Sequence, residues 1–190
     1  MKLEQAGWSP DSPAAEWTTG PVPGLDPASL GAYRAYDDWA FAQVCAAAAK
    51  LSAQQLDRRF EIGPGSVRLA LAHMCQAEQW WLQNWTHDSP QPFPAFREDQ
   101  SIAELHQQHS QTATERDRFL AGLRAADLAR PVSASPRPGL TMTFPLSATM
   151  LQLCCHGTHH RAQVLNMLRR LGAEVPGLDY LAMLRQQQPA

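Results

Sequence analysis

Four long segments with helical periodicity, separated by breaks rich in proline and glycine, constrain this chain more than any other feature. Apolar residues recur three and four positions apart over about 28–51, 67–85, 101–123 and 145–171, the spacing that places them on one face of a helix. A helix with one apolar face must bury it against another element. The pattern therefore predicts an all-α fold, an antiparallel four-helix bundle.

The ends of these segments carry residues that commonly begin or end a helix. Asp26 precedes Pro27 and can cap the first helix, with the proline in its first turn. Ser66 and Ser101 are expected to cap the second and third helices. Gly172 stands where the fourth helix would end in a left-handed residue.

The first 26 residues differ from the rest of the chain. They contain four prolines and three glycines, a density that excludes a long helix. We expect residues 1–26 to form an extended lead-in, anchored to the domain by Trp8 and Trp17. Residues 27–190 are expected to form a single bundle domain.

Two smaller elements are expected near the last long helix. Short alternating runs on either side of Gly139, within residues 130–144, predict a small hairpin that precedes this helix. Residues 179–186 predict a short final helix.

The net charge argues against some partners. Lysine and arginine number 16 against 18 acidic residues, for a formal charge of -2, so the chain cannot gather many phosphates and is not expected to bind nucleic acid. The longest charge-free stretch, 138–160, is interrupted by Pro145 and contains several polar residues. It is a poor candidate for a membrane span, which needs about 20 mainly apolar residues.

The sequence favours a cytoplasmic location. Residues 1–13 lack the apolar core of a secretory signal. The four cysteines show neither a CxxC pair nor the spacing of a disulfide-rich module, so we expect reduced and mostly buried thiols. They are Cys45, Cys75, Cys154 and Cys155.

Two of the seven histidines are placed to act together. His156 and His160 are four residues apart on the fourth helix, so their side chains are offset by only about 40° and project one turn apart from the same face. That face also carries apolar residues and should point into the bundle. His159 falls on a more polar flank, and we expect it to be a bystander.

His73 completes a candidate metal site. It lies in the apolar stripe of the second helix, between small residues one turn away on either side, Ala70 and Ala77. Three inward imidazoles make the set that binds a divalent metal and leaves a position open for water or substrate. Taken alone, His73 is better explained as a hydrogen-bonded core histidine, and the metal site is favoured only by the three histidines together. The remaining histidines are expected to be solvated: His87, His106 and His109.

Three charged residues are candidates for supporting roles. Asp37 interrupts an apolar stripe that includes Tyr33 and therefore needs a partner. It could complete the metal shell or hydrogen-bond the bound nucleophile, or it could be a structural partner of Arg34 or of a tyrosine. Glu78 and Arg161 could pair and orient the ligand helices, or form an ordinary surface ion pair.

Three separated motifs resemble those of the DinB-like family, of the DinB/YfiT type. The motifs follow the family's order. The first-helix motif is Tyr36–Ala40, and the second-helix motif comprises Leu71–His73, Ala77–Glu78 and Trp81–Leu82. The last-helix motif comprises His156–Gln163 and Met167–Gly172. The match covers about residues 28–186. It departs from the family pattern at Ala162, where glycine is common, and at Asp37, where asparagine is common.

The resemblance implies a four-helix bundle, often a homodimer, with a three-histidine site for one divalent transition metal such as zinc or nickel. Related proteins include S-transferases and isomerases that use low-molecular-weight thiols such as bacillithiol or mycothiol. It therefore implies a small-molecule substrate, while many members of the family have no assigned activity.

Three functional hypotheses follow. The first is a metal-dependent thiol S-transferase acting on small electrophiles; Gly157 stands where a zinc protease helix carries its glutamate base, which disfavours peptide hydrolysis. The alternative is a non-enzymatic, metal-stabilised ligand-binding or stress protein, which would gain support if Asp37 or a cysteine closed the metal shell. The third, a metal-free dimerisation module, requires the histidine arrangement to be coincidental.

Overall fold

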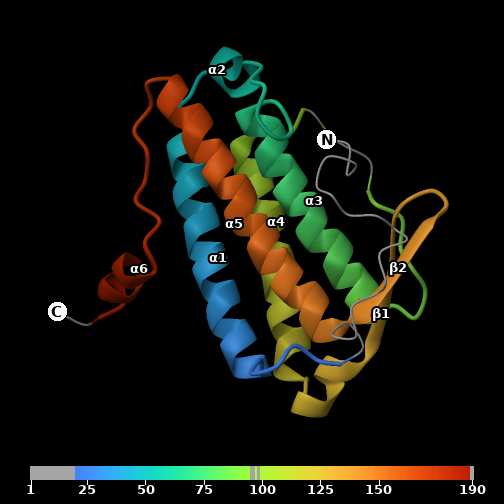
Figure 1. Ribbon diagram of the computed structural model, residues 1–190. Helices are drawn as coiled ribbons and strands as arrows, with labels where there is room; N and C mark the ends of the chain where they lie inside the picture. The colour runs from blue at the N-terminus through green and yellow to red at the C-terminus, as the bar shows by residue number, and fades with distance from the viewer. Residues whose placement is uncertain (1–19, 95–96, 98, 189–190) are drawn as a thin grey trace.

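The four predicted long helices are present and pack into a bundle. They are α1 (Pro27–Ala48), α3 (Val67–Thr86), α4 (Ile102–Ala121) and α5 (Leu146–Arg170). Figure 1 shows their arrangement in the computed structural model of the protein. The structure describes residues 20–94, 97 and 99–188. The expected anchoring by Trp8 and Trp17 lies outside these residues.

The helix boundaries follow the predicted capping residues. The side chain of Asp26 accepts a hydrogen bond from the Ser29 backbone N–H, with Pro27 in the first turn of α1. Ser66 and Ser101 cap α3 and α4 in the same way. We expected the first helix to continue to about residue 51, but it ends at Ala48.

Two short helices were not anticipated. Ser52 caps α2 (Ala53–Asp57) and exchanges hydrogen bonds with Gln55, a capping box that the sequence does contain. The 3-10 helix η3 (Ala125–Ala129) follows α4 and begins where the Asp127 carboxylate accepts hydrogen bonds from the backbone N–H and the guanidinium of Arg124. Both are short turns that change the direction of the chain at the ends of the bundle.

Each long helix contacts two others. α1 packs against α4 and α5, and α3 packs against the same pair, so α1 lies diagonally opposite α3 (Figure 1). The start of α3 lies beside the start of α4, because Arg68 donates a hydrogen bond of 2.7 Å to the Gln100 carbonyl. The end of α3 lies beside the start of α5, where Trp85 donates to Thr149 at 3.0 Å.

These contacts define the helix directions. α3 is antiparallel to α5, and α1 is antiparallel to α4, whereas the pairs α3/α4 and α1/α5 are parallel (Figure 1). The antiparallel arrangement expected from the sequence thus holds for two of the four neighbouring pairs. The other two are parallel because the connection from Thr86 to Ile102 returns to the end where α3 begins.

The predicted hairpin is confirmed. Strands β1 (Pro131–Arg137) and β2 (Leu140–Pro145) pair antiparallel, with Val132 opposite Phe144. Gly139 adopts a φ of 78° in the turn between them, a conformation that favours glycine. Val132 is buried and belongs to an apolar cluster with residues of α3 and α5, so the hairpin packs against these two helices.

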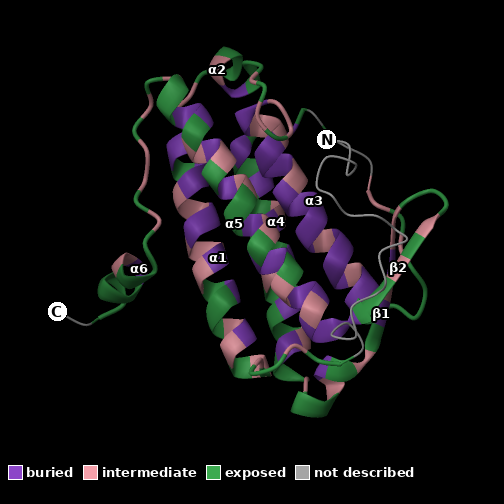
Figure 2. Cartoon of the chain, viewed as in Figure 1, coloured by how far each residue is buried: buried purple, intermediate pink, exposed green. Residues whose placement is uncertain are grey.

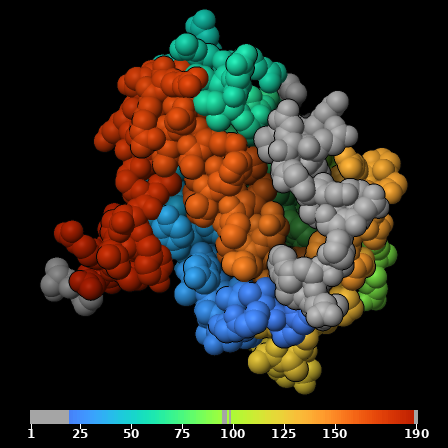
Figure 3. Space-filling view, in the orientation of Figure 1, coloured from blue at the N-terminus to red at the C-terminus, as the bar shows by residue number. Residues whose placement is uncertain are grey.

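The predicted final helix is also present and lies beside α1. Helix α6 (Tyr180–Gln186) is capped by Asp179 and stands out from the bundle in Figure 3. Tyr36 of α1 donates a hydrogen bond of 2.7 Å to the Leu178 carbonyl just before it. The chain bends away from α5 at Gly172, whose φ of 70° fits its predicted position after the helix end.

The buried residues, purple in Figure 2, face the interior of the bundle. Among the described residues, the buried apolar side chains form two clusters. One is formed around Phe41, Leu71, Leu105 and Leu168, and the other around the tryptophans of α3 and the hairpin. Tyr33, predicted to belong to the buried stripe of α1, is 52% exposed. Arg34 takes its place in the interior because buried carboxylates neutralise the guanidinium.

No helix in the described ranges is both long and apolar enough to cross a membrane.

Candidate metal centre

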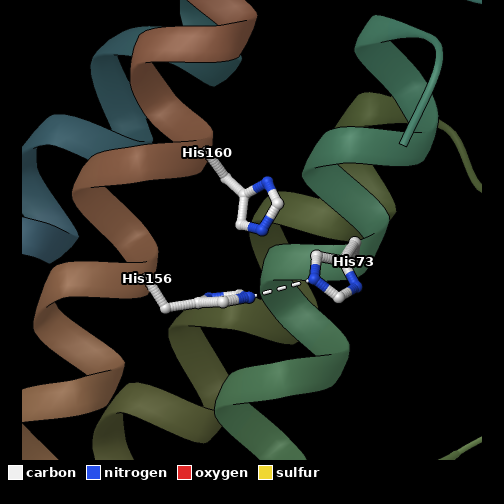
Figure 4. Close-up of side chains that lie close together, drawn as sticks. All are labelled: His73, His156 and His160. Atoms are coloured by element: carbon white, nitrogen blue, oxygen red, sulfur yellow. Dashed lines mark hydrogen bonds between the residues drawn. The ribbon is translucent and has the colours of Figure 1, made fainter. Parts of the chain in front are cut away.

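The antiparallel packing of α3 against α5 brings three imidazoles together. His73 comes from the middle of α3, and His156 and His160 come from successive turns of α5. Figure 4 shows the three rings converging in the space between the two helices. The structure thus places the sequence-predicted histidines side by side.

The nitrogen atoms lie within coordination range of a shared ion. The Nε2 atoms of His73 and His156 are 2.9 Å apart, and one nitrogen from each of the three rings lies within 4.8 Å of the others. Two nitrogens bound to one tetrahedral zinc ion are separated by about 3.3 Å, given Zn–N bonds of about 2.05 Å. The observed separations, 2.9 Å for His73–His156 and at most 4.8 Å for the other pairs, are compatible with that value.

Burial keeps the three imidazoles neutral at neutral pH. It lowers the pKa of His73 to about 4, with a further contribution from His160. The pKa of His156 falls to about 3, through burial and then through His160 and His73. Burial also lowers the pKa of His160. Neutral imidazole is the form that binds a metal, so the donor set fits a divalent transition ion.

The centre has the composition of an open site. All three histidines remain partly exposed, and in the described part of the chain their group includes no carboxylate or thiolate ligand. Structural zinc sites are usually closed by four protein ligands, whereas three protein ligands leave a position for a small molecule.

A layer of charged side chains crosses the bundle at the level of the histidines. We use "charged layer" for Arg34, Asp37, Asp38, Glu78, Arg116 and Arg161, which come from α1, α3, α4 and α5. Five of these six are buried, and the exception is Asp38. Along α1, α4 and α5 they fall between the residues of the two apolar clusters, and on α3 Glu78 lies at the border of the second cluster.

Ion pairs join the layer from helix to helix. Arg34 donates to Asp37 at 2.7 Å and also to Glu78. Arg116 donates to Glu78 and, at 3.1 Å, to Asp38. Arg161 of α5 donates to Asp37 of α1. The three guanidinium groups balance the three carboxylates, which reduces the cost of burying them.

These pairs include the residues predicted to have supporting roles. Asp37 pairs with Arg34 and Arg161, which agrees with the structural role among those considered from the sequence. Burial raises its pKa, and the two arginines oppose that effect. Glu78 and Arg161 do not form the pair we expected: each binds a different partner, and Arg34 with Asp37 connects them.

Gly157 allows the contact between α1 and α5. A β-carbon at this position would lie 2.9 Å from Arg161 Nη1 and 3.6 Å from both carboxylate oxygens of Asp37. The side chain of any other residue would push on this buried pair. The glycine that counted against a protease helix therefore has a structural role here.

The prediction that His109 is solvated is wrong. Its ring is buried and stacks on Phe41 with centroids 4.0 Å apart, while Nε2 lies 3.7 Å from Asp38 and 3.8 Å from Glu78. Burial lowers the pKa of His109, opposed by the two carboxylates. Asp38, Glu78 and His109 form a second group that could hold a metal ion. Arg116 already pairs with both carboxylates, so their charge is neutralised from within the protein.

The other histidine and cysteine predictions can be compared with burial. His87, His106 and His159 are exposed, as expected. Three of the four cysteines are buried free thiols, and Cys155 is exposed.

Fold and site together define a four-helix bundle with a three-histidine candidate metal centre. A profile of the DinB family matches residues 28–190. The chain therefore belongs to the DinB family, as its three motifs indicated. No curated protein sequence matches it significantly.

Two solved structures have a similar fold. A DinB-like protein from Bacillus cereus superposes with a TM-score of 0.61 at 16% identity, covering 79% of this chain and 95% of that one. YfiT from Bacillus subtilis superposes with a TM-score of 0.56 at 16% identity, covering 81% and 94%. It is described as a probable metal-dependent hydrolase with an unusual four-helix bundle topology. At this identity, the likeness supports the fold.

Proposed function

We propose that this protein binds one divalent transition metal ion, zinc or nickel, through His73, His156 and His160, and acts as a metal-dependent enzyme on a small molecule. The observation that carries the proposal is the convergence of three neutral, partly exposed imidazoles from two helices. Nearby buried acidic groups are already paired with arginines, which leaves the histidines as the available donor set.

The chemistry of such a site is activation of a nucleophile. A divalent ion in this position lowers the pKa of a bound thiol or water, so that a nucleophile is available near neutral pH. The protein contributes the three imidazoles and the fixed spacing of α3 and α5, maintained by the charged layer. The partial exposure of the rings leaves one side for substrate to approach.

We further propose a low-molecular-weight thiol as the nucleophile, in accordance with the family resemblance. In that reaction the sulfur forms a bond to an electrophilic carbon, while chloride leaves or an epoxide C–O bond opens, and the thiol proton passes to solvent or to the opened oxygen. Hydrolysis, with water as the nucleophile, is the second candidate. It is favoured by the fold similarity to YfiT, which is described as a probable metal-dependent hydrolase.

Metal binding is tested by elemental analysis of the purified protein. We expect about one zinc or nickel ion per chain and loss of that ion in the double variant His156→Ala/His160→Ala. The matched control is His87→Ala/His106→Ala, which removes two exposed histidines. Equal metal content in all three proteins would refute the site.

Activity is tested with the metal-loaded protein, a small thiol and a panel of electrophiles that includes a chlorinated aromatic compound and an epoxide. Turnover that disappears on chelation and returns with metal supports S-transfer. Turnover of ester or amide substrates without thiol supports hydrolysis. Retention of metal without any turnover would favour the non-enzymatic ligand-binding alternative.

A further inference from the structure

The side chain of Gln163 lies between two histidines of α5. Its Oε1 is 2.8 Å from Nδ1 of His160, one turn earlier in the helix. Its Nε2 is 2.8 Å from Nε2 of His159. Gln163 is half-buried, and both ends of its amide are used by these contacts.

The contact with His160 determines which ring nitrogen carries the proton. An amide oxygen only accepts hydrogen bonds, so Nδ1 of His160 must donate. A neutral imidazole has a single N–H, and Nε2 of His160 therefore keeps its lone pair. This leaves Nε2 as the metal-binding nitrogen, in the ring that converges with His73 and His156 (Figure 4).

The amide itself lies against the turn that precedes α3. Gly63 in this turn has a φ of 51°, and a β-carbon there would lie 2.0 Å from Oε1 of Gln163. The backbone of the turn thus lies directly against the amide oxygen. Only glycine combines that conformation with that close approach.

We propose that Gln163 is a positioning residue for the metal centre. Packed against the turn at Gly63, its amide orients the His160 ring and stabilises the tautomer in which the unprotonated Nε2 faces His73 and His156. The inference rests on the proposed function, because it assumes that the three histidines bind a metal. Residues that accept a hydrogen bond from the second nitrogen of a ligating histidine commonly change metal affinity by about 10- to 100-fold when replaced. Its role would be exerted through His160, without contact with the metal or substrate.

The first test compares the Zn²⁺ affinities of three proteins by competition with a chromogenic chelator. Gln163→Ala removes the acceptor, and we expect its affinity to fall by about 10- to 100-fold. Gln163→Glu keeps an oxygen acceptor for Nδ1 and should retain affinity within about threefold of the original, since carboxylates commonly fill this role. Equal affinity in Gln163→Ala and the original protein would overturn the proposal.

The second test moves the amide without altering it. Gly63→Ala should lower Zn²⁺ affinity, because the new β-carbon occupies the place of the amide oxygen. Gly172→Ala is the matched control: its φ is 70°, but a β-carbon there meets no atom within 4 Å. Both variants introduce similar backbone strain. An equal effect of the two on metal affinity would mean that strain, rather than displacement of Gln163, is responsible.

A third readout does not depend on metal. Nitrogen-detected NMR of metal-free protein should show His160 in the Nδ1–H tautomer and a shift toward the Nε2–H tautomer in Gln163→Ala. If the original protein binds no Zn²⁺ yet shows this tautomer change, the proposed function fails while the hydrogen bond is supported. If it binds Zn²⁺ and His160 is already in the Nε2–H form without metal, the positioning role is refuted while the metal site stands.

Discussion

Replacing Glu78 with glutamine tests the charged layer most directly. The carboxylate is buried and accepts hydrogen bonds from Arg34 and Arg116. Burial alone would raise the pKa of Glu78, but Arg34 and the other surrounding cations outweigh it and lower the pKa from 4.5 to about 2. At about 1.4 kcal/mol per pKa unit, this difference corresponds to about 3 kcal/mol of folding stability at neutral pH. Breaking a buried ion pair usually costs about 3–5 kcal/mol, which agrees.

The contribution of Glu78 to folding stability should depend on pH in a definite direction. The pKa of Glu78 is lower in the folded protein than in the unfolded chain, so its contribution is complete above about pH 4.5 and is lost as the pH falls toward 2. Glu78→Gln should therefore lower the free energy of unfolding by about 3 kcal/mol at pH 7. The gap between variant and original should narrow steadily below pH 4.5.

Urea unfolding followed by tryptophan fluorescence measures this difference at a series of pH values. Glu115→Gln, on the exposed side of α4, is the matched control and should change stability by less than about 0.5 kcal/mol. A loss below about 1 kcal/mol at pH 7 would show that the pairs with Arg34 and Arg116 do not stabilise the fold. A large loss that stays constant between pH 7 and pH 3 would refute the electrostatic explanation.

Three further predictions address packing and metal. Gly157→Ala should lower the melting temperature by disturbing the Arg161–Asp37 pair. Gly31→Ala is the control, because a β-carbon there meets no atom within 4 Å, and it should raise the free energy of unfolding by about 0.5–1 kcal/mol. A change of stability in the same direction for both variants would contradict this. Leu71→Ala, in the core, should cost about 2–5 kcal/mol in urea unfolding, against less than about 0.5 kcal/mol for the exposed Leu181→Ala. Chelation should lower the melting temperature of the metal-loaded protein and leave that of the His156→Ala/His160→Ala variant unchanged.

The parts of the fold that depend on nearby residues were predictable. Capping by Asp26, Ser66 and Ser101 involves contacts within one helical turn, so the sequence alone located the helix starts. The spacing of His156 and His160 placed both on one face of a helix for the same reason.

The parts that depend on distant residues were not. Helical periodicity does not specify which helices become neighbours, so the parallel pairs could not be foreseen. His109 was hidden by the polar residues around it, although Leu105, Thr112 and Arg116 lie with it at three- and four-residue intervals on one face. A hydropathy pattern predicts that Arg116 is solvated, because it does not show that Arg116 forms ion pairs with Glu78 and Asp38 on other helices.

The charged layer also limits how the helices can slide. Apolar faces tolerate small rotations and translations with little loss of contact, whereas Arg34 and Arg116 each donate to carboxylates on two helices and have few geometries that satisfy both. Exchanging the layer for apolar side chains of equal volume would remove a large desolvation cost and raise thermal stability. The same exchange would allow α3 to shift along α5, and with it His73 relative to the two histidines of α5 that are candidate ligands. Thermal stability would therefore rise while metal affinity falls.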